Sequence, residues 1–233
     1  MWIYSNLLLS SVAIPFILSF DKKLQFYRQW KYILPSIFMV AFFYIIFDIY
    51  LTELGVWGFN ALYYSNILIL NLPIEEWLFF IVIPYASIFL HESLVLYFPR
   101  FQLSHIASNL LTIALIVTIS IVLSLNFDKT YTVYIFSLLI LALFLSLFDK
   151  AQIIKRFYLT FLVIIIPFIA VNAILTGSFI DKEVVWYNNN ENLGIRFLTI
   201  PIEDFGYAFS LILLNLLLIG KIKKQNHKQI KIT

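Results

Sequence analysis

Seven runs of apolar residues constrain the fold of this chain more than any other feature. About 20 apolar residues are needed to cross the hydrocarbon core of a bilayer. With 62% hydrophobic and 12% charged residues, against about 25% charged in soluble domains, the composition excludes an ordinary soluble protein. The sequence predicts an all-α integral membrane bundle of seven transmembrane helices. These helices are expected at roughly residues 2–20, 32–51, 74–97, 106–126, 131–148, 157–175 and 201–220.

The distribution of Lys and Arg predicts the orientation of the helices, because cytoplasmic loops carry an excess of these residues. If the N-terminus lies outside, all but three of the 16 basic residues fall in cytoplasmic segments; the exceptions are Lys129, Lys182 and Arg196. We therefore expect an N-out, C-in protein of the cytoplasmic membrane. Residues 221–233 would form a basic cytoplasmic tail beside anionic lipid headgroups. The longest outer segment, about 176–200, is predicted to be a loop with an aromatic turn.

A short acidic motif occurs twice, each time directly before an apolar run. Residues 73–76 read Pro-Ile-Glu-Glu, and residues 201–204 read Pro-Ile-Glu-Asp. The match extends upstream, because Trp57 precedes the first proline by 16 residues and Trp186 precedes the second by 15. The duplication indicates that the chain is built from two related halves.

The positions of the two motifs predict how these halves are arranged. Residues 1–105 would hold the first three helices, and residues 127–220 would hold the last three. Residues 106–126 would form a linking helix without a motif. One linking helix between two three-helix repeats makes the repeats parallel, a known membrane arrangement. Both motifs are therefore expected on the same, outer side of the membrane.

The paired acids are Glu75 and Glu76 in the first motif and Glu203 and Asp204 in the second. Placing a carboxylate at the edge of the hydrocarbon core costs free energy, so such a residue is by default a candidate functional residue. The alternative is a helix start, where acids face the positive end of the helix dipole. Adjacent helical residues lie about 100° apart, so one acid of each pair can face the interior while the other faces the aqueous rim. A carboxyl kept neutral in an apolar cavity could donate a proton to a hydrocarbon.

Further candidates lie near the motifs. Asp48 is either an auxiliary acid of the site or an interfacial residue that caps the outer end of its helix. His91 and Glu92 lie about 24 Å from the motif acids at 1.5 Å per residue, so we interpret them as structural residues of the cytoplasmic end. Most aromatic residues near the motifs fit an interfacial belt, but ring faces also stabilise cations. The candidate substrate-binding aromatics are Trp57, Trp77, Trp186 and Phe205.

The composition also removes whole classes of chemistry. Without Cys, the chain has no disulfide, thiolate nucleophile or thiolate metal site. Its three His have no metal-ligand spacing, and its six Gly form no Gly-x-Gly-x-x-Gly run for a dinucleotide. We expect no metal, no cofactor and no nucleic-acid partner.

The doubled Pro-x-Glu-(Glu/Asp) motif, in Phe-rich helices and small three-helix repeats, resembles that of the membrane lycopene cyclases. This chain looks like the fused, two-repeat form of that family. The resemblance implies redox-neutral, proton-initiated cyclisation of the linear ends of lycopene to β-ionone rings. It implies Glu75 and Glu203 as principal site residues, with Glu76 and Asp204 assisting as proton partners or as the base. A homo-oligomer, or association with other carotenoid enzymes, stays open.

Alternatives are also compatible with the sequence. Two parallel three-helix repeats also describe small sugar transporters of the SWEET type, in which acid pairs could couple to protons. A membrane protein that binds a hydrophobic ligand is a further alternative, whereas a purely structural assembly protein would not need paired acids twice. A retinal protein does not fit, because residues 201–220 contain no Lys for a Schiff base. The two motifs are followed by different residues, so the halves could be unequal, and β- and ε-ring products are not distinguished.

Overall fold

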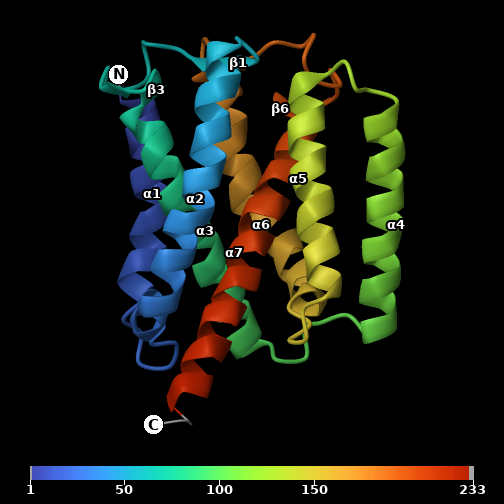
Figure 1. Cartoon of the computed structure of the whole chain (residues 1–233). Coiled ribbons are helices and arrows are strands. Elements are labelled where there is room, and N and C mark those ends of the chain that lie inside the picture. The colour runs from blue at the N-terminus through green and yellow to red at the C-terminus, as the bar shows by residue number, and fades with distance from the viewer. Residues whose placement is uncertain (1, 231–233) are drawn as a thin grey trace.

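The computed structural model describes the backbone of residues 2–230 and the side chains of residues 2–226. Figure 1 shows a bundle of upright helices with the two termini at opposite ends. Among the described residues, six helices are long and apolar enough to cross a membrane, and α1 is a shorter apolar helix. The predicted all-α membrane bundle is confirmed. Its helices are α1 (Ile3–Leu18), α2 (Trp30–Glu53), α3 (Ile74–Tyr97), α4 (His105–Ser124), α5 (Thr130–Leu147), α6 (Ile154–Leu175) and α7 (Ile202–Ile230), and a 3-10 turn, η1 (Phe26–Gln29), precedes α2.

Helix α7 extends ten residues beyond its predicted end at residue 220. The expected basic tail is therefore helical as far as Ile230, and residues 231–233 lie outside the described residues. Two physical reasons favour this extension. Lys and Gln are good helix formers, and cations near the carboxyl end of a helix interact favourably with its dipole.

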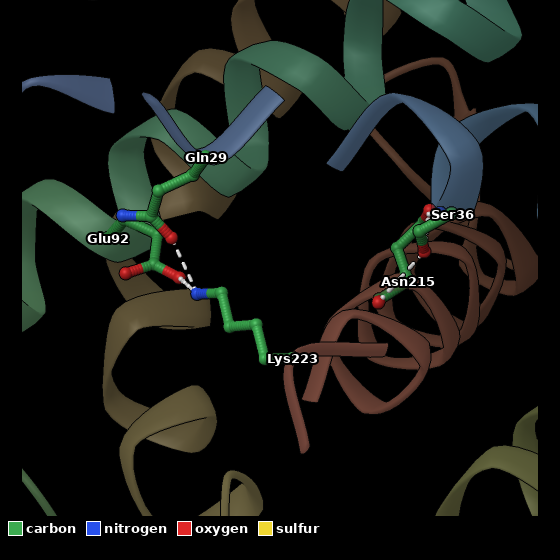
Figure 2. Close-up of polar contacts among 5 residues, drawn as sticks. All are labelled: Gln29, Ser36, Glu92, Asn215 and Lys223. Atoms are coloured by element: carbon green, nitrogen blue, oxygen red, sulfur yellow. Dashed lines mark hydrogen bonds and ion pairs between the residues drawn. The ribbon is translucent and has the colours of Figure 1, made fainter. Parts of the chain in front are cut away.

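Contacts at the inner end tie α7 to the first half of the chain (Figure 2). The Lys223 ammonium donates a hydrogen bond to Gln29 Oε1 at 2.5 Å and lies 3.3 Å from Glu92 Oε1. At the middle of α7, Ser36 Oγ donates to the backbone and side-chain oxygens of Asn215, both at 3.0 Å. These contacts join α7 to η1, α2 and α3, so the two halves form one bundle.

The linking helix α4 stands at the edge of the bundle (Figure 1). It packs mainly on α5, whereas α7 packs on both α5 and α2, and α1 packs on α3. Most α4 side chains are exposed. Its inward-facing side chains, among them Leu115, Ile116 and Ile119, pack against the edge of the hydrophobic core.

Short strands cover the outer end of the bundle. Strand β1 (Trp57–Phe59) pairs antiparallel with β4 (Val185–Tyr187) across the two halves. Two hairpins lead directly into α3 and α7. They are formed by β2 (Leu68–Ile69) with β3 (Leu72–Pro73), and by β5 (Arg196–Phe197) with β6 (Ile200–Pro201).

These strands were not expected from the sequence, which predicted a loop over residues 176–200. Strands of two or three residues are too short for an alternating hydrophobic pattern to be recognised. The first hairpin does carry a turn signal, because Leu70 and Asn71 both have positive φ angles, of 50° and 64°. Positive φ at both central positions is typical of a type I′ hairpin turn, and Asn favours it.

The strand register corrects the upstream match between Trp57 and Trp186. In the β1–β4 pair, Trp57 lies opposite Tyr187, and Gly58 lies opposite Trp186. An approximate two-fold axis between the strands therefore relates Gly58 to Trp186 and Phe59 to Tyr187. Phe59 and Tyr187 both precede the second acid of their motif by 17 residues. The unequal 16- and 15-residue spacings of the tryptophans reflect this shift by one residue.

Candidate active site

A cavity of about 430 Å³ lies beneath the β1–β4 pair, between α1, α3, α6 and α7. Along α3 it extends from Glu76 to Leu90, which corresponds to about 21 Å of helix. The side chains around it are mostly apolar. Its volume falls within the roughly 300–1,000 Å³ range of small-molecule sites, and its length suits an extended apolar ligand.

Two carboxyl groups, one from each motif, line the outer end of this cavity. They belong to Glu76 of α3 and Asp204 of α7, which are both buried. Glu76 Oε2 accepts a hydrogen bond from the phenol of Tyr4. Asp204 accepts two, from Tyr131 at 2.5 Å on Oδ1 and from Tyr187 at 3.0 Å on Oδ2. Each motif thus contributes its second acid to this cavity.

The phenol of Tyr187 comes from strand β4, outside the helices. Burial raises the pKa of this phenol well above its usual value, and the nearby carboxyl charge of Asp204 acts in the same direction. The phenol therefore stays protonated at neutral pH. It remains a hydrogen-bond donor to Asp204.

The first acids of the two motifs, Glu75 and Glu203, are not among the residues that line the cavity. They are 1% and 0% exposed, so neither faces an aqueous rim, although the sequence allowed one acid of each pair to do so. Each joins the first helix of its repeat to the segment before its hairpin. Glu75 Oε1 accepts hydrogen bonds from Ser5 Oγ at 2.8 Å and from the Ser65 backbone N–H at 2.9 Å. Glu203 Oε1 accepts them from Thr132 Oγ1 at 2.7 Å and from the Leu193 backbone N–H at 2.8 Å.

Sequence reasoning missed the hydroxyl partners of the four acids. Residues 4–5 read Tyr-Ser and residues 131–132 read Tyr-Thr, at the start of the first helix in each half. In both halves the tyrosine bonds the second acid and the smaller hydroxyl bonds the first. The sequence did carry a signal for these partners. A Tyr followed by Ser or Thr occurs at nearly the same distance before each motif.

Asp48 of α2 is an interior acid and not an interfacial cap. It is 1% exposed, and neither of its oxygens has a hydrogen-bond partner among the described residues. It lies close enough to Glu76 for the two carboxyl charges to interact. A third carboxyl therefore lies behind the Glu76 side of the cavity.

Comparison with known protein families fits this arrangement. The family model described as Lycopene cyclase matches residues 1–94 and 128–221, one segment for each motif. The chain belongs to the lycopene cyclase family. Searches of curated proteins and of solved structures return no match. As a member of this family the protein is a carotenoid-cyclising membrane enzyme, and its substrate is a carotenoid.

One of the four predicted substrate-binding aromatics lines the cavity of this lycopene cyclase family member. It is Trp57, whose ring lies 5.1 Å from that of Tyr131. Trp77 and Phe205 directly follow the cavity acids, so the 100° helical step turns them elsewhere. Trp77 Nε1 donates to Ile69 O at 3.2 Å, and Phe205 packs on Phe168.

Trp186 is also outside the lining of the cavity, for a different reason. Its strand neighbours Val185 and Tyr187 line the cavity, and successive residues of a strand point to opposite faces. Trp186 therefore covers Gly58 on the far face of the pair. The aromatic side chains that sequence analysis did not select as substrate-binding, but that line the cavity, are Phe59, Phe79, Phe89, Phe168, Tyr187 and Tyr207, with the Tyr4 and Tyr131 already described.

The cavity opens on the side of the bundle between α1 and α6. Ser10 and Ile14 of α1, with Pro167 and Ala170 of α6, line the cavity and are also exposed on the outer surface. Ser10 and Pro167 lie near the middle of their helices. In a membrane the opening therefore meets the hydrocarbon of the bilayer, where a carotenoid dissolves.

His91 and Glu92 lie at the inner end of α3, and both have polar partners there. His91 is buried and its Nδ1 lies 2.7 Å from Thr160 Oγ1, and Glu92 pairs with Lys223. Within residues 2–226, no cluster of three or more His, Asp or Glu side chains could hold a metal ion.

Proposed function

We propose that this protein is a lycopene β-cyclase of the cytoplasmic membrane, which closes the linear ends of lycopene into β-ionone rings. The observation that carries the proposal is the pair of buried carboxyls, Glu76 and Asp204, at one end of a single elongated apolar cavity. Closing a ring in this way changes no oxidation state. The reaction therefore needs an acid, a base and an apolar pocket that holds the polyene.

The proposed reaction has three steps. A carboxylic acid protonates the terminal double bond of lycopene, which leaves a tertiary cation. The π electrons of an internal double bond attack this cation and form the six-membered ring. A carboxylate then removes a ring proton and restores a double bond. Positioned carboxyls are suited to both transfers, and the ring faces of Trp57, Phe79 and Tyr207 lie where they can stabilise the intermediate cation.

The lateral opening supports a substrate that arrives from the bilayer. Lycopene is a hydrocarbon, and an opening at mid-depth between α1 and α6 lets one end slide in without crossing water. The cavity extends about 21 Å along α3, so it encloses one end of the polyene. We propose that the two ends of lycopene react in turn.

The geometry leads us to assign the chemistry to the second acid of each motif. Glu76 and Asp204 face the cavity, whereas Glu75 and Glu203 bond a hydroxyl and a backbone amide on the outer side. We propose that the first acids hold the hairpins in place. This assignment reverses the order of importance that the family resemblance implied.

Four variants expressed in lycopene-accumulating cells test the assignment. Glu76→Gln and Asp204→Asn should each lose β-ring formation by about 10²- to 10⁴-fold, the usual contribution of general acid–base catalysis. The matched variants Glu75→Gln and Glu203→Gln should keep measurable β-ring formation and lower thermal stability instead. A wild-type chain that is present in the membrane but leaves lycopene unchanged would overturn the function. Loss of β-rings in the second pair only would overturn the assignment.

A further inference from the structure

The geometry points to a division of labour between the two cavity acids, and we propose that Glu76 donates the proton to the polyene and Asp204 removes the ring proton. This inference rests on the proposed function and adds to it the role of each carboxyl. The two halves of the chain supply similar acids. Their surroundings differ in four respects, and all four favour the same assignment.

The first difference is the number of phenol donors. Both oxygens of Asp204 accept a phenol hydroxyl, from Tyr131 and from Tyr187. Among the described residues, Glu76 accepts a side-chain hydrogen bond from Tyr4 alone. Hydrogen bonds donated to a carboxylate stabilise its charged form. The two phenols therefore favour the anionic form of Asp204 more than the single phenol of Tyr4 favours that of Glu76, and one oxygen of Glu76 has no side-chain donor among the described residues.

The second difference lies in the strands. The approximate two-fold axis relates Tyr187 of β4 to Phe59 of β1, which has no hydroxyl to donate. Both side chains line the cavity. The second phenol of Asp204 thus has no counterpart on the Glu76 side.

The third difference lies in the hairpins. Arg196 pairs with Pro201 in the second hairpin, and Leu68 pairs with Pro73 in the first. The Arg196 guanidinium lies 5.7 Å from the centre of the Tyr187 ring, and its positive charge acts on Asp204 against the negative charge of the adjacent Glu203 carboxyl. A cation near Asp204 favours its ionised form. Leu68, at the related position of the first hairpin, is apolar and places no positive charge near Glu76.

The fourth difference is Asp48. This buried acid lies near Glu76, and neither of its oxygens has a hydrogen-bond partner within the described part of the chain. Two neighbouring carboxyls in an apolar region repel each other as anions, so they share a proton. Asp48 therefore favours a protonated carboxyl on the Glu76 side, which is the form that a proton donor needs.

The assigned roles give a balanced reaction. The O–H bond of Glu76 breaks as a C–H bond forms at the terminal double bond. After ring closure, a ring C–H bond breaks, its electron pair becomes the new double bond, and the proton goes to Asp204. Between turnovers Asp204 loses its proton to water and Glu76 gains one from water. The base also decides the product, because loss of a different ring proton places the double bond elsewhere.

The products of the variants distinguish the two roles. With Glu76→Gln, lycopene should remain and no cyclic product of any kind should form. With Asp204→Asn, lycopene should still be consumed, but the cation should end in rings with a displaced double bond or in a hydrated product. These compounds are separated by chromatography and identified by NMR, while thermal unfolding of each purified variant confirms that it folds.

A milder pair of variants keeps both acids in place. Tyr187→Phe removes one donor from Asp204 and introduces the residue found at the related position 59, so displaced rings should rise to at least about a tenth of the product. Tyr4→Phe is the matched control; it should change the rate of lycopene consumption and leave the ring type unchanged.

Three outcomes would overturn the division of labour in a wild-type chain that makes β-rings. They are displaced rings from Glu76→Gln, complete loss of lycopene consumption in a folded Asp204→Asn variant, and unchanged ring type in Tyr187→Phe. A wild-type chain without cyclase activity would instead count against the proposed function.

Discussion

Gly58 lies in the β1–β4 pair that covers the cavity, directly opposite Trp186. A Cβ atom at this position would lie 2.3 Å from Cζ2 of Trp186, on the paired strand. We predict that Gly58→Ala lowers the free energy of unfolding by about 1–3 kcal/mol, as overpacking usually does. Thermal unfolding of the purified variant in detergent measures this loss.

A double variant provides the control, because Trp186→Ala removes the ring that the new methyl group would meet. The combined Gly58→Ala/Trp186→Ala protein should be more stable than the sum of the two single losses predicts. Additive losses would contradict the steric account of this pair.

At the residue scale, the sequence predicted the acids but not their directions. The duplicated motif located Glu75, Glu76, Glu203 and Asp204, and their burial follows from their place at the edge of apolar helices. Which acid of a pair faces the cavity depends on the phase of the helix, which is set by contacts with α1 and α5. Those contacts come from residues about 70 positions away, so no local pattern revealed them.

At the scale of elements, the lateral opening between α1 and α6 makes a prediction of its own. Ala170 lines the cavity from an exposed position in the C-terminal half of α6. In Ala170→Trp a large ring should close the opening without touching the acids. The rate of lycopene consumption by protein in liposomes should fall about tenfold, or ~1.4 kcal/mol in the barrier.

Leu162→Trp is the matched control for this variant. Leu162 is an exposed α6 residue that is not among those lining the cavity. A tryptophan at position 162 therefore adds the same apolar ring to α6 without closing the opening. Equal rates in the two tryptophan variants would show that the substrate uses another route.

The helices were more predictable than the strands. An apolar run of membrane length determines a helix by itself, and α3 begins and ends within one residue of its predicted limits. Strands β1 and β4 exist only because two distant segments meet, one on each side of the two-fold axis. Their pairing depends on how the two halves pack, which the local sequence does not encode.

At the scale of the whole molecule, the duplication brings one acid from each half to a single cavity. Each half has two motif acids but contributes only one carboxyl to the lining of the cavity. The other acid is bound to the segment before the hairpin. The shared cavity explains why both copies of the motif are present. The unequal surroundings of Glu76 and Asp204 explain how two similar halves can perform different steps. The N-out, C-in orientation stays a prediction from the charges.

The most direct test of the central claim is the conversion of lycopene by the purified wild-type protein in liposomes, with no flavin, nicotinamide or metal added. The account predicts β-ring carotenes with the same mass as lycopene, because cyclisation only rearranges bonds. Unchanged lycopene in the presence of folded, membrane-inserted protein would contradict it.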